Sequence, residues 1–118
     1  MKASVTQVQE LDAALRDQPP QEILRAAFEH HGGGIELAFS GAEDVVLIDM
    51  ATRVCDEVRV FCLDTGRLHA ETLLFIERVR ERYPIELDVL SPGHQAVEAL
   101  VRKKGLFSFL VDGHQECC

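Results

Sequence analysis

Hydrophobic and polar positions follow two periodic patterns along this chain, and the first is that of a helix. Val8, Leu11 and Leu15 recur at the three- and four-residue spacing of one helical face. Two prolines interrupt this segment, and Pro20 is suited to the first position of a new helix because its missing N–H is not needed there. We therefore expect a second helix over residues 21–30.

The second predicted helix has its own apolar face and a clear end. Glycine readily adopts the left-handed conformation that closes a helix, so the run HGGG after residue 30 should end it. The side chains expected to be buried on this helix are Ile23, Leu24, Ala27 and Phe28.

The rest of the chain repeats one pattern three times: a short strand-like run, a polar turn and an amphipathic stretch. The strand-like runs are IELAF (35–39), VRVFCL (58–63) and IELDVL (85–90), and the helical stretches cover about 44–55, 69–83 and 95–104. Pro84 bounds the third run, and Ser91 is expected near the N-cap of the last helix. Alternating strands and helices predict parallel strands joined by right-handed crossovers, hence an α/β fold with one parallel sheet and flanking helices.

Polar turns follow the first two predicted strands, at the edge where α/β sheets bind ligands. In FSGAED, Gly41 permits a sharp turn after Ser40, and Asp44 stands where the next helix begins. The N–H groups of that helix start could form an anion pocket. A plain strand-to-helix turn with Asp44 as a first-turn acid explains the same residues.

The second turn, CLDTGR, also has two interpretations. Asp64 and Thr65 could bind the hydroxyl groups of a ligand, or they could make the local side-chain bonds of a tight turn. Both turns project from the same edge of one sheet, and together they favour a nucleotide site. His69 and Glu71 follow without a convincing catalytic partner and are expected to be structural.

Composition limits the classes of function. The 118 residues suffice for one domain with a hydrophobic core, and a net charge of −8 argues against a nucleic-acid surface. The basic residues 102–104 are explained as a solvated helix end. No apolar run approaches the ~20 residues of a membrane span, and the charged N-terminus is unlike a signal peptide. We therefore expect a cytoplasmic protein that does not act at a membrane.

Four cysteines in a reducing compartment are more often ligands, catalysts or buried thiols than disulfides. Cys55 and Cys62, at a helix end and within a strand, are expected to be buried thiols. Cys117 and Cys118 are adjacent, and with Cα atoms only ~3.8 Å apart they cannot form a relaxed disulfide with each other. Either their partners lie elsewhere or the chain is cut within a site.

Four motifs in order, FSGAEDVVLIDMA, FCLDTGRLHAET, KGLFSF and DGHQECC, resemble the N-terminal half of assimilatory sulfonucleotide reductases. These enzymes reduce adenylyl sulfate, or its 3′-phosphorylated form, to sulfite on the route to cysteine. The resemblance covers about residues 24–118 and implies the adenine-nucleotide α-hydrolase-like (Rossmann-like) fold. It also implies thioredoxin as the electron donor and leaves open a homo-oligomer.

The resemblance assigns roles to individual residues. It implies that the first loop cradles the phosphosulfate and that the second holds adenine and ribose; the residues are Ser40, Gly41, Ala42, Glu43 and Asp44, and Leu63, Asp64, Thr65 and Gly66. In the adenylyl-sulfate branch a Cys-Cys pair and a later Cys-x-x-Cys hold a [4Fe–4S] cluster. Cys117 and Cys118 are thereby implied to be metal ligands, in agreement with the thiolate chemistry of such clusters.

The sequence also departs from the family pattern. It contains neither a second Cys-x-x-Cys nor the family's nucleophilic cysteine, so we expect a truncated single domain, 1–118, that is inactive alone. The alternatives are a catalytically inactive module that binds adenine nucleotides and a reductase of the 3′-phosphorylated substrate. A third, an ATP pyrophosphatase, is disfavoured because Ala42 and Val45 replace a glycine and a serine of that family's first loop.

Overall fold

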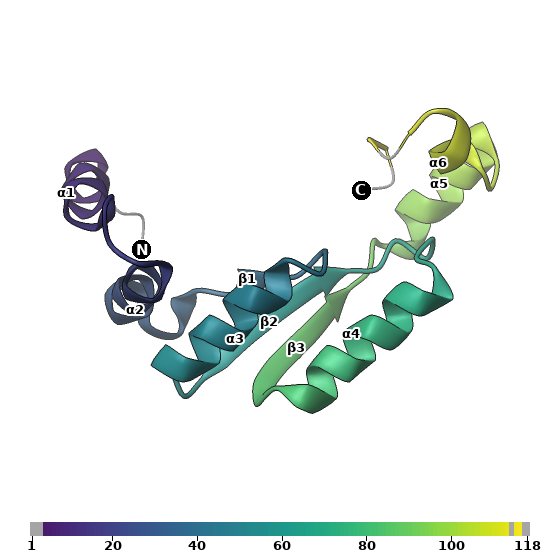
Figure 1. Ribbon diagram of the computed structural model, residues 1–118. Coiled ribbons are helices and arrows are strands. Elements are labelled where there is room, and N and C mark those ends of the chain that lie inside the picture. Colours follow the sequence, from purple (N-terminus) through teal and green to yellow (C-terminus); the bar gives the residue numbers. More distant parts are fainter. Residues whose placement is uncertain (1–3, 114, 117–118) are drawn as a thin grey trace.

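Three parallel strands form the centre of the computed structural model, which describes residues 4–113 and 115–116 (Figure 1). The strands are β1 (Leu37–Ala38), β2 (Val58–Leu63) and β3 (Ile85–Leu90), in the order β1-β2-β3. Val58 pairs with Ile85 and Leu63 pairs with Leu90, so β2 and β3 run side by side over their whole lengths. The predicted α/β fold with a parallel sheet is confirmed.

The first strand is shorter than the sequence predicts. Of the five residues in IELAF, only Leu37 and Ala38 pair with β2, opposite Val60 and Phe61. The next N–H, that of Phe39, still donates to the Phe61 carbonyl at 2.8 Å. The first run is therefore joined to β2 by two paired residues and this one further bond.

Helices account for most of the remaining chain. They are α1 (Val5–Leu15), α2 (Pro20–His31), α3 (Asp44–Val54), α4 (Ala70–Arg82), α5 (His94–Lys104) and α6 (Ser108–Val111), with a 3₁₀ turn η1 (Gly32–Gly34) after α2. Gly32 has φ 57°, so the predicted glycine termination of α2 is confirmed. No helix in the described part of the chain is long and apolar enough to cross a membrane.

The core lies on one face of the sheet. Strand order follows chain order, and crossovers of this type are right-handed, so α3 and α4 are placed on the same side. The alternate residues Val58, Val60 and Cys62 of β2 are buried there, against Ile48 of α3 and Val79 of α4. The two fully buried large side chains, Ile48 and Val60, mark the centre of this layer.

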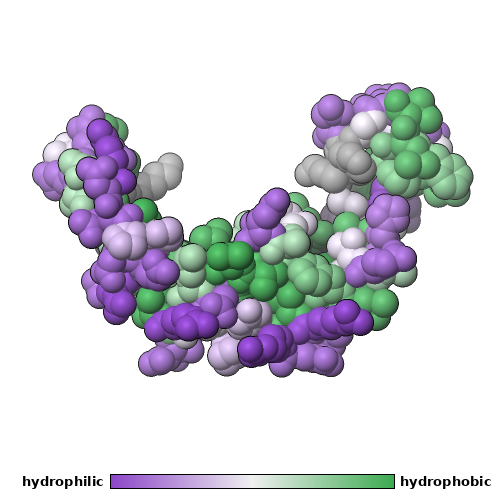
Figure 2. Space-filling view, in the orientation of Figure 1, coloured by the Kyte–Doolittle hydropathy of each residue, from purple (hydrophilic) through white to green (hydrophobic). Residues whose placement is uncertain are grey.

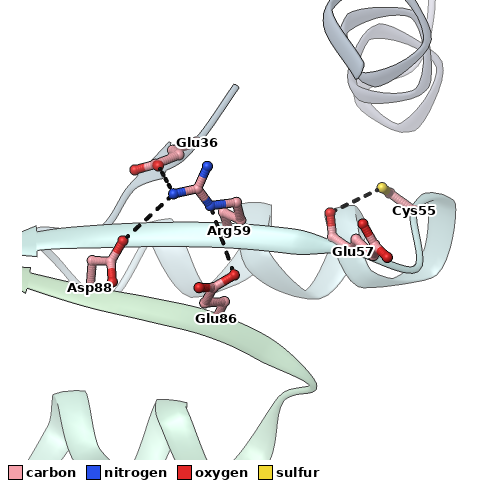
Figure 3. A network of polar contacts seen from close by, with 6 residues as sticks. All are labelled: Glu36, Cys55, Glu57, Arg59, Glu86 and Asp88. Carbon is pink, nitrogen blue, oxygen red and sulfur yellow. Dashed lines mark hydrogen bonds and ion pairs between the residues drawn. The ribbon is translucent and has the colours of Figure 1, made fainter. Parts of the chain in front are cut away.

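The opposite face of the sheet carries charge. Arg59 of β2 forms ion pairs with three carboxylates: Glu36 at 2.7 Å, Glu86 at 3.8 Å and Asp88 at 3.9 Å (Figure 3). These contacts join β2 to β3 and to the residue that precedes β1. The Arg59 side chain is 43% exposed, so solvent screens these ion pairs and they contribute little free energy.

The molecule is open, with helices extending from both ends of the sheet (Figure 1). Its radius of gyration is 17.6 Å, whereas a compact chain of this length has about 13.5 Å. Hydrophobic surface gathers in the hollow between the two helical ends and at the tip that carries α6 (Figure 2). The exposed apolar residues of that tip are Leu106, Phe107, Leu110 and Val111.

Helices α1 and α2 form the N-terminal end of the molecule. Ser4 caps α1, accepting the Gln7 N–H at 3.2 Å while the Gln7 side chain accepts the Ser4 N–H at 2.9 Å. Phe28 of α2 reaches the core, as predicted, but the prediction that Ile23 is buried is wrong. Ile23 is 42% exposed because it lies toward α1, where the two helices leave an open groove.

The C-terminal helices differ from the sequence prediction in two details. Gly93, not Ser91, occupies the N-cap position of α5. Pro92 explains the shift, since a residue before proline is held in an extended conformation and Ser91 cannot approach the helix start. The four-residue helix α6 was not predicted, because one turn is too short to show a helical period.

Candidate functional site

The carboxyl ends of the three strands meet at one edge of the sheet, and a polar turn follows each of them. Residues 40–44 follow β1 and lead into α3, residues 64–69 follow β2 and lead into α4, and residues 91–93 join β3 to α5. Parallel strands place these turns at the same edge, where open α/β sheets bind their ligands.

The first turn is organised around one carboxylate. Oδ2 of Asp44 accepts the backbone N–H of Ser40 at 2.7 Å, the N–H of Gly41 at 3.0 Å and the Ser40 hydroxyl at 3.2 Å. These bonds, the backbone N–H of Ser40 first, hold the pKa of Asp44 below its ordinary value. Asp44 is also the first residue of α3, so its charge faces the positive end of the helix dipole.

This geometry changes how an anion would bind. The N–H groups of Ser40 and Gly41 are directed at Asp44 within the protein, so an incoming phosphate or sulfate group would compete with that carboxylate for them. Ala42 and Glu43 are exposed at the tip of the turn. A Cβ atom built on Gly41 meets only the flexible Glu43 side chain, at 3.7 Å.

The second turn is tied together by local bonds. Oδ1 of Asp64 accepts the Gly66 N–H at 2.8 Å, and Gly66 has φ 79°, a value that favours glycine. The N–H of Asp64 donates to the carbonyl of Leu90 at 2.8 Å, which joins this turn to the end of β3. Leu63, the last residue of β2, is 52% exposed at the same edge.

Arg67 connects the second turn to the C-terminal helices. This contact was not predicted from the sequence. Its guanidinium donates to the Thr65 carbonyl at 3.1 Å and lies over the Phe109 ring at 5.5 Å. Phe109 belongs to α6, more than forty positions along the chain. A tertiary contact of this kind leaves no local pattern in the sequence.

A cavity of about 370 Å³ opens between the second and third turns. It is lined by Asp64, Thr65, Gly66, Ser91, Pro92, His94, Val97 and Glu98. The residues of the first turn do not line it. The polar side chains of His94 and Glu98, one helical turn apart on α5, are additions that the sequence analysis did not single out.

The described thiols are not exposed at this edge, although Cys62 is the residue before Leu63 in β2. Cys62 is 3% exposed and packs in the core, where burial and then the charge of Asp64 raise the pKa of its thiol. Cys55, half-buried at the end of α3, donates from Sγ to the Glu57 carbonyl at 3.4 Å (Figure 3). Among residues 4–113 and 115–116, no group of three or more His, Cys, Asp and Glu side chains could hold a metal ion. Cys117 and Cys118 lie outside the described residues.

The basic end of α5 is partly structural. Lys104 was expected to be solvated, yet only 26% of its side chain is exposed. Its ammonium group pairs with Glu116 at 2.8 Å and Asp112 at 3.3 Å, and these bonds raise the pKa of Lys104. They hold the segment after α6 against α5.

Comparison with known proteins decides the family. Residues 34–118 match the phosphoadenosine phosphosulfate reductase domain. This chain belongs to that family. The match covers both strand-end turns and the two terminal cysteines, so the resemblance carried by the four sequence motifs is confirmed.

The chain is also similar to proteins that are named as reductases. The adenosine 5′-phosphosulfate reductase of Pseudomonas aeruginosa (strain LESB58) is 59% identical over 108 residues, which are 92% of this chain and 40% of that protein. The chloroplastic 5′-adenylylsulfate reductase 1 of Arabidopsis thaliana is 49% identical over 110 residues, 93% of this chain and 24% of the relative. The chain therefore spans two fifths or less of these two relatives.

Proposed function

We propose that this chain is the nucleotide-binding part of an adenylyl-sulfate reductase. The phosphosulfate would bind at Ser40–Asp44, and adenine and ribose at Leu63–Gly66. The observation that carries the proposal is the placement of these two turns, at the carboxyl ends of adjacent paired strands in a member of the reductase family. The names of relatives at 59% and 49% identity favour adenylyl sulfate as the substrate.

The first turn suits a phosphosulfate for two reasons. Backbone N–H groups at the start of a helix bind anions without a cluster of basic side chains, which agrees with a chain of net charge −8. Gly41 has no side chain to obstruct close approach of the ligand to the backbone. Asp44, which accepts the same N–H groups in the free protein, would keep the turn in shape until the substrate arrives.

The chemistry of the whole reductase would need a nucleophilic thiolate at this edge. The thiolate attacks the sulfate sulfur, a sulfur–sulfur bond forms, and the bond to the AMP oxygen breaks so that AMP departs. A thioredoxin dithiol would then supply two electrons, release sulfite and become a disulfide. Neither described cysteine has an exposed thiol at this edge, because Cys62 is packed in the core and Cys55 lies at the end of α3. We therefore assign this chain substrate binding and not the thiol step.

An iron–sulfur cluster belongs to the same proposal. Cys117 and Cys118 would be two of its four thiolate ligands, and further cysteines would have to complete the set. The described residues do not fit the remaining positions, because Cys62 is packed in the core and Cys55 stands at the opposite edge of the sheet. Only two of the four ligands are therefore assigned.

Calorimetry with AMP and with adenylyl sulfate tests the binding proposal. We expect Gly41→Val to lower the affinity for both ligands at least tenfold, because a branched side chain would occupy the space of the bound anion. The substitution should leave the fold intact, since a Cβ at Gly41 meets only Glu43. Gly33→Val is the matched control: a Cβ there meets nothing within 4 Å, and Gly33 lies at the other edge of the sheet.

Two results would contradict the proposal. One is that neither nucleotide binds to the folded wild-type chain. The other is that Gly41→Val, with an unchanged unfolding curve, binds both nucleotides as tightly as Gly33→Val. An Asp64→Ala variant should also bind more weakly, because Asp64 lies in the second turn and lines the cavity.

The second candidate is a catalytically inactive module that holds an adenine nucleotide. Among the described residues no exposed thiol lies at the strand-end edge, which favours this candidate for the chain taken alone. Reading the encoding gene beyond Cys118 distinguishes the candidates: a downstream Cys-x-x-Cys and a further cysteine segment would support the reductase.

A further inference from the structure

The cavity between the second and third turns is the feature that carries a further inference. It has about 370 Å³, within the range of small-ligand pockets, roughly 300–1,000 Å³. It is lined by residues 64–66 of the second turn, by Ser91 and Pro92 of the third turn, and by the start of α5. The proposed function places the nucleoside end of the substrate beside this cavity.

The charge of the lining is negative. Two of the eight lining residues, Asp64 and Glu98, are carboxylates, and none is lysine or arginine. Asp64 is fixed in place by the Gly66 N–H, which occupies one of its two oxygens. The neighbouring cation, Arg67, directs its guanidinium to the Thr65 carbonyl and the Phe109 ring.

A negatively charged lining would interact differently with a ribose that has free hydroxyls and with a ribose that carries a phosphate. Free ribose hydroxyls donate hydrogen bonds, and carboxylate oxygens accept them. A phosphate on the ribose carries up to two negative charges and presents hydrogen-bond acceptors. Both carboxylates would therefore repel it. Discrimination between two similar ligands often depends on a repulsive element of this kind.

We propose that Glu98, with Asp64, makes this cavity select the unphosphorylated ribose of adenylyl sulfate and reject its 3′-phosphorylated counterpart. Glu98 is thus a specificity-determining residue on α5, outside the two turns that hold the nucleotide. The inference rests on the proposed function, because it requires the nucleoside to bind at the Leu63–Gly66 turn.

The test compares two probes, AMP and adenosine 3′,5′-bisphosphate, by calorimetry on the 118-residue chain at low salt. Both titrations are run at pH 8. We expect the wild type to bind AMP at least tenfold more tightly. Glu98→Gln should bind the bisphosphate about fivefold more tightly than the wild type, the effect of one like charge at ~4 Å in water.

The remaining expectations are equally specific. Glu98→Gln should bind AMP within about twofold of the wild type, because glutamine keeps an acceptor oxygen. Glu81→Gln removes the same charge near the far end of α4 and should leave the preference unchanged. Raising the salt concentration should reduce the preference of the wild type for AMP over the bisphosphate, since ions screen the repulsion.

The outcomes separate this inference from the proposed function. If neither probe binds the wild type, the proposed function fails and the inference fails with it. If AMP binds but the wild type shows no preference, or if Glu98→Gln leaves the preference as it was, the inference alone is overturned. If Glu98→Gln weakens the binding of both probes equally, the inference is also overturned, because Glu98 is then a general contact and not a specificity residue.

Discussion

The carboxylate of Asp44 offers the sharpest test of the first turn. Asp44→Asn keeps the shape of the side chain and one acceptor oxygen but removes the charge. Three hydrogen bonds reach Oδ2, and charge-assisted bonds are roughly twice as strong as neutral ones, which contribute about 1 kcal/mol each. Because the turn borders solvent and its N–H groups can be rehydrated, we expect a loss of about 1 kcal/mol of unfolding free energy at pH 7.

The pH dependence of this loss identifies its origin. Hydrogen bonds from Ser40 and Gly41 lower the pKa of folded Asp44 below the ordinary value of 3.8. A lowered pKa in the folded state contributes stability that is complete above the unfolded value and is lost as the pH falls through the folded value. The difference between wild type and Asp44→Asn should therefore be constant from pH 7 to about pH 5 and shrink below pH 4.

Urea unfolding curves at pH 7, 5 and 3 measure this difference. Asp17→Asn is the control, an exposed carboxylate between α1 and α2, and should change stability by less than about 0.5 kcal/mol. A difference that is equal at pH 7 and pH 3 would show that the charge of Asp44 does not stabilise the turn. A loss no larger than that of Asp17→Asn would refute the assigned hydrogen bonds.

Three further predictions concern sulfur chemistry. Cys62 should react with a thiol reagent more slowly than Cys55, because it is 3% exposed and burial raises the pKa of its thiol; equal rates in the folded chain would contradict its core position. A thioredoxin-coupled assay should detect no sulfite from adenylyl sulfate, and turnover abolished by Cys117→Ser would reveal a nucleophile that we have not assigned. Anaerobic reconstitution with iron and sulfide should give no stable [4Fe–4S] cluster on a single chain, which needs four thiolates; one full cluster per chain would refute this.

Elements flanked by strong breaks could be predicted from the sequence alone. The limits of β2 (Val58–Leu63) and β3 (Ile85–Leu90) agree with the apolar runs, because Pro84 and the polar residues beside each run end the pattern sharply. The helix start at Asp44 was also correct. Family membership followed from four short motifs in order, and these motifs lie mostly in the turns and their flanking elements.

Features that depend on distant contacts could not be predicted. The Arg59 network requires the strand register, which brings together charges from three separate segments. Glu98 lines the cavity only because residues 91–93 bring α5 beside the turn that follows β2. The exposure of Ile23 depends on where α1 lies, and no pattern within α2 reports that position.

The strand order β1-β2-β3 bears on how the chain folds during synthesis. Each strand pairs with its predecessor in the sequence, so no part of the described sheet must wait for a later segment to be inserted between two earlier ones. A single helical crossover separates each pair of neighbouring strands, which limits the entropic cost of bringing them together. The sheet can therefore grow one β-α unit at a time as the polypeptide leaves the ribosome. The ion pairs of Arg59 with Glu86 and Asp88 can form only after the third strand has emerged.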